Sequence, residues 1–210
     1  MNNKFSFKIG ILLCLSVVIC SSCRCLITPQ YVKEYFNYCY DGAYTGIDTL
    51  INIEGYYSHH HSDSPRLMFY KDGICINGFG VGVWGGKTVQ TQFEEVVNNP
   101  RELKAFHRSG SWGCYIISGD TIKIRTVRRP VCGSTDITWR LEVERYKIID
   151  KNTLERIYPP ASVGNQWAPT KFYPLTVRPN SDCSLKKKKW FWCNKEQYKE
   201  YKRTLKQSRK

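Results

Sequence analysis

The chain has 210 residues with a hydrophobic content of 41%, which is enough for a core of its own and excludes a wholly disordered protein. Its net charge of +14 lies mostly at the two ends, because residues 186–210 hold eleven Lys or Arg and two Glu, and residues 1–22 hold two Lys and no acid. The stretch 23–185 therefore carries a net charge of only +3, and we expect no nucleic acid partner.

The first 22 residues have the pattern of a signal peptide. Lys4 and Lys8 precede a 12-residue apolar run, residues 9–20, and the small residues Ser21 and Ser22 follow it. Twelve residues are too few for a helix that spans a bilayer, which takes about 20. We therefore predict a signal peptide over residues 1–22 and export of the mature chain.

Cys23 directly follows this pattern. The run Ser21-Ser22-Cys23 resembles the lipobox of bacterial lipoproteins, although Cys20 stands where that motif usually has an aliphatic residue. The resemblance implies that Cys23 is lipidated, becomes the mature N-terminus and anchors the chain to a membrane of the bacterial cell envelope. The alternative is an ordinary secretory signal that is cleaved near the same place.

The cysteine content fits both alternatives. Seven cysteines remain for other roles if Cys23 is lipidated, and eight remain if it is not, an even number that would suit four disulfides in an oxidising compartment. Cys114 lies within a strand-like run, where we expect a buried free thiol.

Residues 23–46 are expected to form an N-terminal tether with a short helix, since Thr28 can cap a helix and Pro29 suits its first position. A β domain is predicted over residues 47–185, with its first strand over residues 47–57. Asp72 and Gly73, between two short apolar runs, predict a hairpin turn.

Two segments interrupt the strand pattern. The glycine-rich run of residues 78–86 lacks both the GxGxxG spacing and the following helix of a dinucleotide site, so we interpret it as a bend in a curved sheet. Asn99, Pro100 and Glu102 have the order of an N-cap, a first-turn proline and a capping-box acid. They predict one short helix inserted in the β domain.

Residues 111–157 look like two successive β-hairpins. A two-residue turn at Gly119 and Asp120 would pair Tyr115 with Ile124, whereas a three-residue turn that includes Ser118 would pair Cys114 with Ile124. The two registers bury opposite faces of the first strand. Turn statistics favour the two-residue loop, but the sequence leaves both open.

The second hairpin alternates apolar and charged residues. Leu141 and Val143 alternate with Glu142 and Glu144, so we expect both glutamates on an exposed face and a bulge where the alternation changes, near Tyr146. Residues 171–178 are predicted to form the last strand.

Few side chains indicate chemistry. Residues 59–61 are consecutive histidines followed by Asp63, but a metal site needs ligands held on rigid elements, so we expect no metal function there. No nucleophile, base and orienting group form a recognisable set, and no GxSxG is present. We therefore expect no enzyme activity, no catalytic residue and no cofactor.

The basic C-terminal tail, residues 186–210, combines lysines with aromatic residues and ends in a helix that starts near Asn194. This composition predicts contact with an anionic membrane, or alternatively with an anionic glycan or another anionic partner, of which nucleic acid is the least expected. The alternative is a solvated tail whose aromatic residues pack on the β domain. The contact residues expected in the first case are Lys186, Lys187, Lys188, Lys189, Trp190 and Trp192.

Taken as a whole, the pattern resembles the lipocalin-like (calycin-type) proteins of bacterial envelopes. Gly55, Tyr56 and Tyr57 stand where those proteins have a Gly-x-Trp motif, and the run of strands from residue 67 to residue 178 resembles their meander of hairpins. The resemblance implies a mainly β fold in which an antiparallel up-and-down meander forms a barrel or a strongly curved sheet. It also implies a small apolar or amphipathic ligand inside the barrel.

Overall fold

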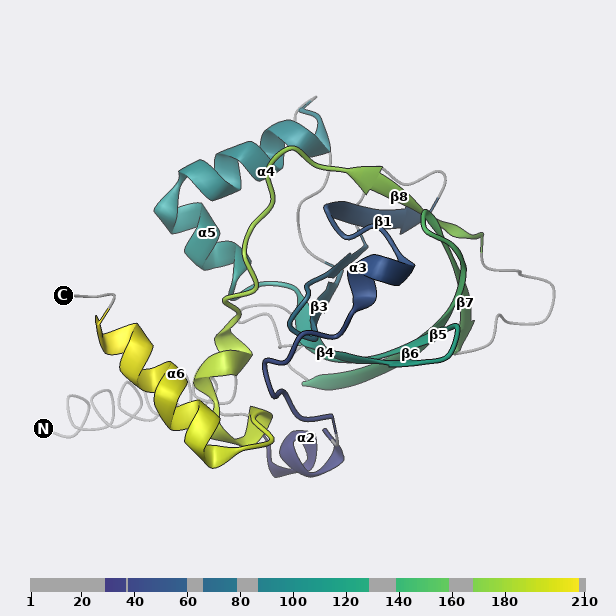
Figure 1. The fold of residues 1–210 in the computed structure, drawn as a ribbon. Coiled ribbons are helices and arrows are strands. Elements are labelled where there is room, and N and C mark those ends of the chain that lie inside the picture. Colours follow the sequence, from purple (N-terminus) through teal and green to yellow (C-terminus); the bar gives the residue numbers. More distant parts are fainter. Residues whose placement is uncertain are drawn as a thin grey trace, which may run out of the picture.

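The computed structural model describes residues 29–36, 38–59, 66–78, 87–128, 139–158 and 168–207. The predicted signal peptide, Cys23 and the glycine-rich run beyond Gly78 lie outside these residues. Eight antiparallel strands form a closed barrel in which each strand pairs with its neighbours in sequence and the last pairs with the first (Figure 1). This order confirms the mainly β, up-and-down fold predicted from the sequence.

The barrel closes between its first and last strands. There Tyr57 lies opposite Phe172 and Gly55 lies opposite Pro174. A Cβ atom on Gly55 would collide with the carbonyl oxygen of Tyr173 and the ring of Phe172, so glycine is required where these two strands meet. The strands are β1 (Gly55–His59), β2 (Leu67–Phe69), β3 (Ile74–Asn77), β4 (Ser111–Ser118), β5 (Thr121–Arg128), β6 (Arg140–Asp150), β7 (Thr153–Tyr158) and β8 (Thr170–Pro174).

The helices lie around the barrel, and α3 (Ile47–Leu50) lies across one end of it (Figure 1). The α-helices are α2 (Gln30–Tyr35), α3 (Ile47–Leu50), α4 (Val89–Asn98), α5 (Pro100–Phe106) and α6 (Lys195–Gln207), and two 3-10 turns are η1 (Ser184–Lys187) and η2 (Lys189–Phe191). The short helix expected near Pro29 is confirmed as α2, although Pro29 occupies the cap position, one residue before the predicted place.

The first predicted strand is wrong in its first half. Residues 47–50 form helix α3, and the strand begins only at Gly55. Ile47, Ile51 and Ile53 are buried, as their apolar character indicates, but they fill one end of the barrel interior and do not extend its wall. An apolar run of this length fits a buried helix and a buried strand equally well.

The inserted helix is confirmed, and a second helix precedes it. The Asn99 side chain accepts hydrogen bonds from the backbone amides of Arg101 and Glu102, as an N-cap does at the start of α5. Helix α4 was missed by the sequence reasoning, although Thr88 caps it by accepting from the amide of Thr91.

The turns and registers follow the local sequence signals. Gly73, with a φ of 85°, lies in the turn between β2 and β3, as predicted. The hairpin β4–β5 has the two-residue loop, with Ser118 paired to Thr121 and Tyr115 paired to Ile124. Gly119 has a φ of 62°, which the first position of a type II′ turn requires. A register shift in the β6–β7 pairing at Tyr146 confirms the predicted bulge.

Two apolar clusters stabilise the fold on the two sides of the barrel wall. The inner cluster includes Tyr57, Phe69 and Tyr115. The outer cluster includes Trp112 and Phe191, and it joins β4 to the helices and to the C-terminal segment. Both faces of the first half of β4 are therefore buried, which is why neither register could be excluded from its sequence.

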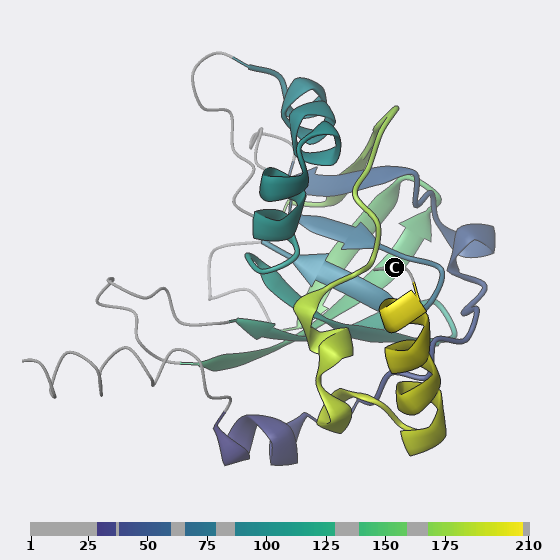
Figure 2. The same ribbon diagram turned by 90° about the vertical axis from the view of Figure 1, so that its left-hand side faces the viewer.

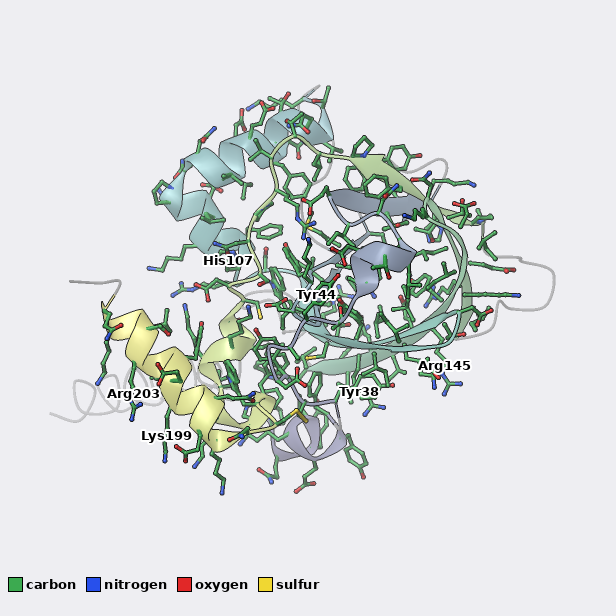
Figure 3. The ribbon with its side chains drawn as sticks, viewed as in Figure 1. Tyr38, Tyr44, His107, Arg145, Lys199 and Arg203 are labelled. Carbon is green, nitrogen blue, oxygen red and sulfur yellow. A yellow bond between two sulfur atoms is a disulfide. The ribbon has the colours of Figure 1, made fainter. Side chains whose placement is uncertain are left out.

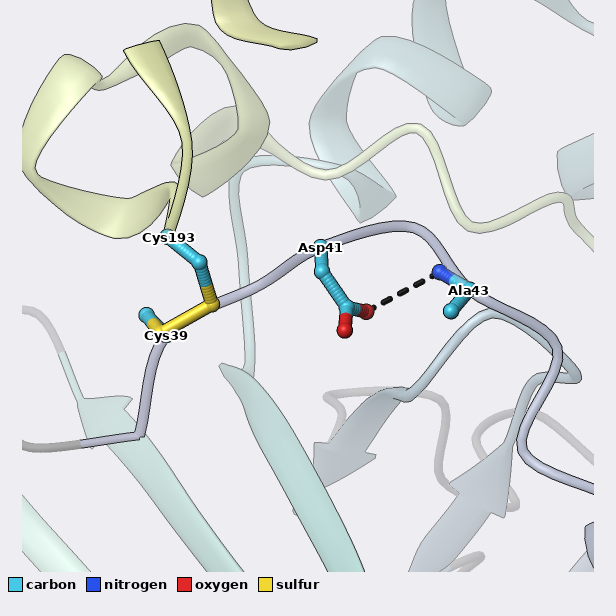
Figure 4. The surroundings of a disulfide bond; sticks show 4 residues. All are labelled: Cys39, Asp41, Ala43 and Cys193. Carbon is cyan, nitrogen blue, oxygen red and sulfur yellow. Dashed lines mark hydrogen bonds between the residues drawn. A yellow bond between two sulfur atoms is a disulfide. The ribbon is translucent and has the colours of Figure 1, made fainter.

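The C-terminal segment belongs to the packed structure. After β8 the chain runs past α4 and α5 to α6 (Figures 1 and 2), and its residues Leu185 and Phe191 are buried in the outer cluster. A disulfide joins Cys39 to Cys193 (Figure 4). Beside it, Tyr40 exchanges backbone hydrogen bonds with Phe191 and Cys193. The two ends of the described chain are thus held together outside the barrel.

Candidate functional site

A charged cluster lies inside the barrel around Glu144, which is only 5% exposed to solvent. Its Oε1 atom accepts from Nη2 of Arg66 at 3.0 Å and from Nη2 of Arg156 at 2.5 Å. Its Oε2 atom accepts from the Tyr146 hydroxyl at 2.5 Å and from Nδ2 of Asn77 at 3.1 Å. The carboxylate therefore has four donors, as a buried ionised group requires.

This position corrects the prediction that Glu144 lies on an exposed face. Alternate residues of β6, among them Glu144, Tyr146 and Ile148, face the barrel interior. Leu141 and Val143 face outward, where α2 and the adjoining chain cover part of the wall. The assumption that apolar residues of a strand face the core failed because this outer face is covered as well.

His59 extends the cluster toward the β1–β8 seam. A guanidinium can only donate, so Nη1 of Arg66, 2.9 Å away, donates to Nε2 of His59, and the proton of the ring lies on Nδ1, which donates to the carbonyl oxygen of Ala168 at 3.1 Å. Burial, together with the charges of Arg66 and Arg156, lowers the pKa of His59. The histidine is therefore neutral at pH 7, and the cluster of Arg66, Arg156 and Glu144 has a net charge of +1.

The cluster lies at the barrel end opposite α3. Helix α3 and the short turns after β2, β4 and β6 occupy one end. Strands β1, β3, β5 and β7 finish at the other end, at which His59, Asn77 and Arg66 lie. We call this the loop end. The interior thus has an apolar zone near α3 and a charged zone near the loop end.

Several buried polar atoms of this zone have no hydrogen-bond partner among the described residues. They include Nε of Arg66 and the hydroxyl groups of Thr126 and Thr170. Both threonines are fully buried and face the interior, since Thr126 pairs with Gly113 and Glu142, and Thr170 pairs with His59. A buried hydroxyl without a partner is costly, so these atoms indicate places where a ligand or water would bind.

Lys186 does not contribute to an exposed basic surface, contrary to expectation. It is 7% exposed, and its Nζ atom lies 2.8 Å from Oδ2 of Asp72 and 2.8 Å from Oγ of Ser181. Burial alone would raise the pKa of Asp72, but the ammonium group of Lys186 and hydrogen bonds from Ser181 and Tyr40 lower it overall. Lys186 therefore ties the C-terminal segment to the β2–β3 turn.

The other residues predicted for an anionic contact divide into two groups. Lys187 and Lys189 are exposed and Lys188 is half-buried. The two tryptophans pack within the protein: Trp190 lies against the ring of Phe36, and the indole N–H of Trp192 donates to the carbonyl oxygen of Lys186. The aromatic residues of the tail therefore pack against the rest of the protein, which is the second of the two arrangements predicted for this segment.

Helix α6 presents a basic face. Its cap is confirmed, since the Asn194 side chain accepts from the amide of Glu196. Tyr201 holds the helix in place by donating to Asp182 at 2.7 Å and by ring contact with Trp192. Lys199 and Arg203 project from α6 away from the barrel (Figure 3). The helix carries five basic and two acidic residues, a net charge of +3.

The structure gives no support to the other kinds of site that the sequence raised. Among the described residues, no group of three or more His, Cys, Asp or Glu side chains could hold a metal ion. His60, His61 and Asp63 lie outside those residues. Within the same ranges, no helix has the length and apolar character to cross a bilayer.

The described part of the chain contains one disulfide, Cys39–Cys193, and three free cysteines. Cys75, Cys114 and Cys183 are buried free thiols, which confirms the prediction for Cys114 and excludes four disulfides. Burial raises the pKa of all three, that of Cys183 to about 11, so they are protonated and unreactive at pH 7. Cys25 and Cys132 lie outside the described residues.

Comparison of the chain with protein-family models, with curated proteins and with solved structures found no match in any of the three. The eight-stranded antiparallel barrel is consistent with a lipocalin-like architecture. The fold and the charged zone inside it therefore carry the functional argument.

Proposed function

We propose that this chain is an exported, lipid-anchored, non-enzymatic protein of the lipocalin-like kind, whose barrel binds a small amphipathic ligand. The observation that carries the proposal is the division of the barrel interior into an apolar zone and a charged zone at the loop end. A ligand with one polar and one apolar end matches such an interior.

The disulfide supports export. Disulfides persist in oxidising compartments and are rare in the cytosol of most organisms. Cys39 and Cys193 are 154 positions apart in sequence and still meet with bonding geometry. A stable cross-link of this kind fits a chain that is delivered outside the cytosol by its signal peptide.

Ligand binding is tested with Nile red, a neutral dye whose fluorescence rises in apolar surroundings. The protein used is the mature chain with Cys23→Ala, which removes the acylation site and leaves every described residue unchanged. We expect saturable binding to the native protein, lost in Thr170→Phe, which fills the loop end, and retained in Thr204→Phe on exposed α6. Circular dichroism confirms that each variant is folded. Absence of saturable binding to the native protein would refute the proposal.

The anchor is tested by metabolic labelling with a radioactive fatty acid. We expect label in the wild type and none in Cys23→Ala, whereas Cys25→Ala, two positions away, keeps it. Equal labelling of wild type and Cys23→Ala would refute the lipid anchor and favour the secreted form.

A second candidate function is contact with an anionic surface through α6 and the exposed lysines before it. The observation in its favour is the net charge of +3 on a helix that is fixed to the barrel, with Lys187 and Lys189 exposed nearby. Each basic residue near an anionic membrane contributes about 1 kcal/mol, and salt weakens the attraction.

Deletion of the tail is not a suitable test, because Lys186, Phe191 and Cys193 hold the fold together. The triple variant Lys187→Gln, Lys189→Gln and Lys202→Gln removes three of the exposed positive charges without removing packing. Its control is Lys104→Gln, Lys147→Gln and Lys151→Gln, three exposed lysines elsewhere. We expect the first set alone to weaken sedimentation with phosphatidylserine vesicles. Equal sedimentation of both sets would contradict this function.

A further inference from the structure

We propose that helix α2 and one side of helix α6 form a single surface that docks on an anionic phospholipid bilayer, the membrane that holds the proposed lipid anchor. The inference rests on the second candidate function, contact with an anionic surface. It names the partner, a bilayer, and the face of the protein that meets it. Both helices lie outside the barrel (Figure 1).

Four lysines of α6 lie along one side of the helix. They are four, three and four residues apart in the sequence, and a helix turns by about 100° per residue, so all four lie within about 60° around its axis. They form a row about 16 Å long. All of them are exposed: Lys195, Lys199, Lys202 and Lys206. We call this row the lysine face.

The acidic residues of α6 lie on another side of the helix. Glu196 and Glu200 follow Lys195 by one and five positions, which places them about 100° and 140° around the axis from it. A carboxylate oxygen of Glu196 lies 2.7 Å from the Lys199 ammonium, and one of Glu200 lies 3.0 Å from the Arg203 guanidinium. No carboxylate of the described chain pairs with the other three lysines of the row. The lysine face therefore keeps its positive charge, which complements an anionic surface.

The packing of α6 leaves the lysine face in solvent and places another lysine beside it. Tyr198 and Tyr201 are half-buried and belong to the side that packs on the protein. Tyr198 lies on the flank next to the lysine face, and its hydroxyl donates to the carbonyl oxygen of Lys187 at 3.1 Å. Tyr201 lies on the other flank and donates to Asp182. Lys187 is exposed, so it extends the lysine face along η1.

Helix α2 presents aromatic side chains at the same edge of the molecule. Tyr31 and Tyr35 are four residues apart, hence on one side of α2, and they are 44% and 68% exposed. Tyrosine is enriched where proteins meet the interface between water and lipid. Lys33 and Glu34 cancel in charge, so α2 contributes no net charge. Both α2 and α6 reach the lower edge of the molecule in both views, with the barrel above them (Figures 1 and 2), so a flat surface can touch the two helices at once.

The two helices are fixed to each other and lie near the proposed anchor. The disulfide joins Cys39, four residues after α2, to Cys193, two residues before α6. Cys23 lies six residues before Pro29, where the described chain starts, and six residues span at most about 20 Å. Lipid attached at Cys23 would therefore bring α2 to the bilayer, and α6 with it. The charge and the position of the surface thus favour the same partner.

The test measures sedimentation of the mature Cys23→Ala chain with vesicles of phosphatidylserine and phosphatidylcholine in equal parts. Without the acyl group, binding depends on the surface of the protein alone. We expect binding that salt weakens, and none to vesicles of phosphatidylcholine only. Circular dichroism confirms that each variant below is folded.

A charge-shifted variant locates the contact on α6. It combines Lys195→Gln and Lys202→Gln with Gln197→Lys and Gln207→Lys, so it keeps the composition and net charge of the helix and moves two lysines off the lysine face. We expect it to bind the vesicles roughly tenfold to thirtyfold more weakly, because two fewer lysines meet the lipid.

Tyr35→Gln tests the contribution of α2. Its matched control is Tyr44→Gln, because Tyr44 is 63% exposed and lies at the barrel, away from α2 and α6 (Figure 3). We expect Tyr35→Gln to weaken vesicle binding by about threefold and Tyr44→Gln to leave it unchanged. Equal binding of the two tyrosine variants would remove α2 from the surface.

The outcomes separate the inference from the function on which it rests. If the Cys23→Ala chain does not sediment with the anionic vesicles, contact with an anionic membrane and the docking surface both fail. If it sediments and the charge-shifted variant sediments equally, binding follows net charge, and only the docking surface is overturned. Binding to heparin that is lost in the charge-shifted variant, with vesicle binding unchanged, would overturn the bilayer and assign the lysine face to an anionic glycan.

Discussion

The ammonium group of Lys186 lies 2.8 Å from the carboxylate of Asp72, and the two residues are 114 positions apart in sequence. This ion pair joins the C-terminal segment to the β2–β3 turn. The Asp72 carboxylate also accepts from the hydroxyls of Tyr40 and Ser181, so the N-terminal segment, the β2–β3 turn and the C-terminal segment meet at one side chain. We therefore expect substitution of Lys186 to lower stability strongly, although residues 186–189 are four consecutive lysines that look equivalent in the sequence.

We expect Lys186→Met to lower the free energy of unfolding by roughly 1–3 kcal/mol, because it leaves the partly buried Asp72 carboxylate without its cation. Lys187→Met, one position along, should change stability by less than about 0.5 kcal/mol, since Lys187 is exposed. Urea denaturation of both variants measures the difference. Equal effects would show that the ion pair contributes nothing specific.

The same pair predicts a dependence on acid. The pKa of Asp72 is lowered in the folded protein, so the unfolded chain takes up a proton first as the pH falls. The stabilisation that ionised Asp72 contributes is fully present well above its ordinary pKa of 3.8. It is lost as the pH falls through the lower pKa that Asp72 has in the folded protein. The stability difference between wild type and Asp72→Asn should therefore be constant above about pH 5 and shrink toward about pH 3. A difference that does not vary with pH would contradict the assignment.

Glu144→Gln should destabilise the barrel strongly. It removes the negative charge that Arg66 and Arg156 share inside the barrel, and breaking a buried ion pair costs about 3–5 kcal/mol. Glu142→Gln is the matched control, two positions earlier on β6, where the side chain is 31% exposed and lies 4.0 Å from Arg128. We expect it to cost less than about 1 kcal/mol. Similar losses in the two variants, measured by denaturation, would argue against a special role for Glu144.

Reduction of the disulfide is expected to lower stability by about 2–5 kcal/mol, because the bond closes a very long loop. The double variant Cys39→Ser and Cys193→Ser should match the reduced wild type and should not respond to reductant. Cys183→Ala, the control, removes a free thiol and should keep the full response to reductant. A reductant-independent melting temperature in the wild type would exclude the cross-link.

Gly113→Ala tests how closely β4 and β5 approach. A Cβ atom at this position would collide with the carbonyl group of Arg125 on the paired strand, so the backbone must shift and we expect a loss above about 2 kcal/mol. At Gly119 the surroundings are open and only its positive φ opposes alanine. Gly119→Ala should therefore cost about 1–2 kcal/mol. Melting temperatures in the reverse order would contradict this account.

The elements that the sequence predicted correctly are those with local signals. The turn at Gly119, the helix cap at Asn99 and the bulge near Tyr146 each depend on residues within a few positions of one another. The last strand was predicted over residues 171–178 and ends earlier, at Pro174. An apolar pattern does not specify where a strand stops pairing.

The features that the sequence did not predict depend on distant segments. Glu144 is predicted on an exposed face because Leu141 and Val143 are expected to face the core, but α2 covers the outer face of the wall there and these apolar residues face outward. Lys186 was grouped with three similar lysines because its partner, Asp72, is far away in sequence. The pairing of Cys39 with Cys193 has no local signal at all.

The cross-link between Cys39 and Cys193 also determines how the molecule carries mechanical load. A force that pulls the N-terminal end away from α6 passes directly through the covalent bond, because residues 40–192 form a closed loop behind it. The barrel strands lie within that loop and bear no tension. Stretching by the two ends should therefore extend only the segments outside the loop, and the barrel should unfold under load only after the disulfide is reduced.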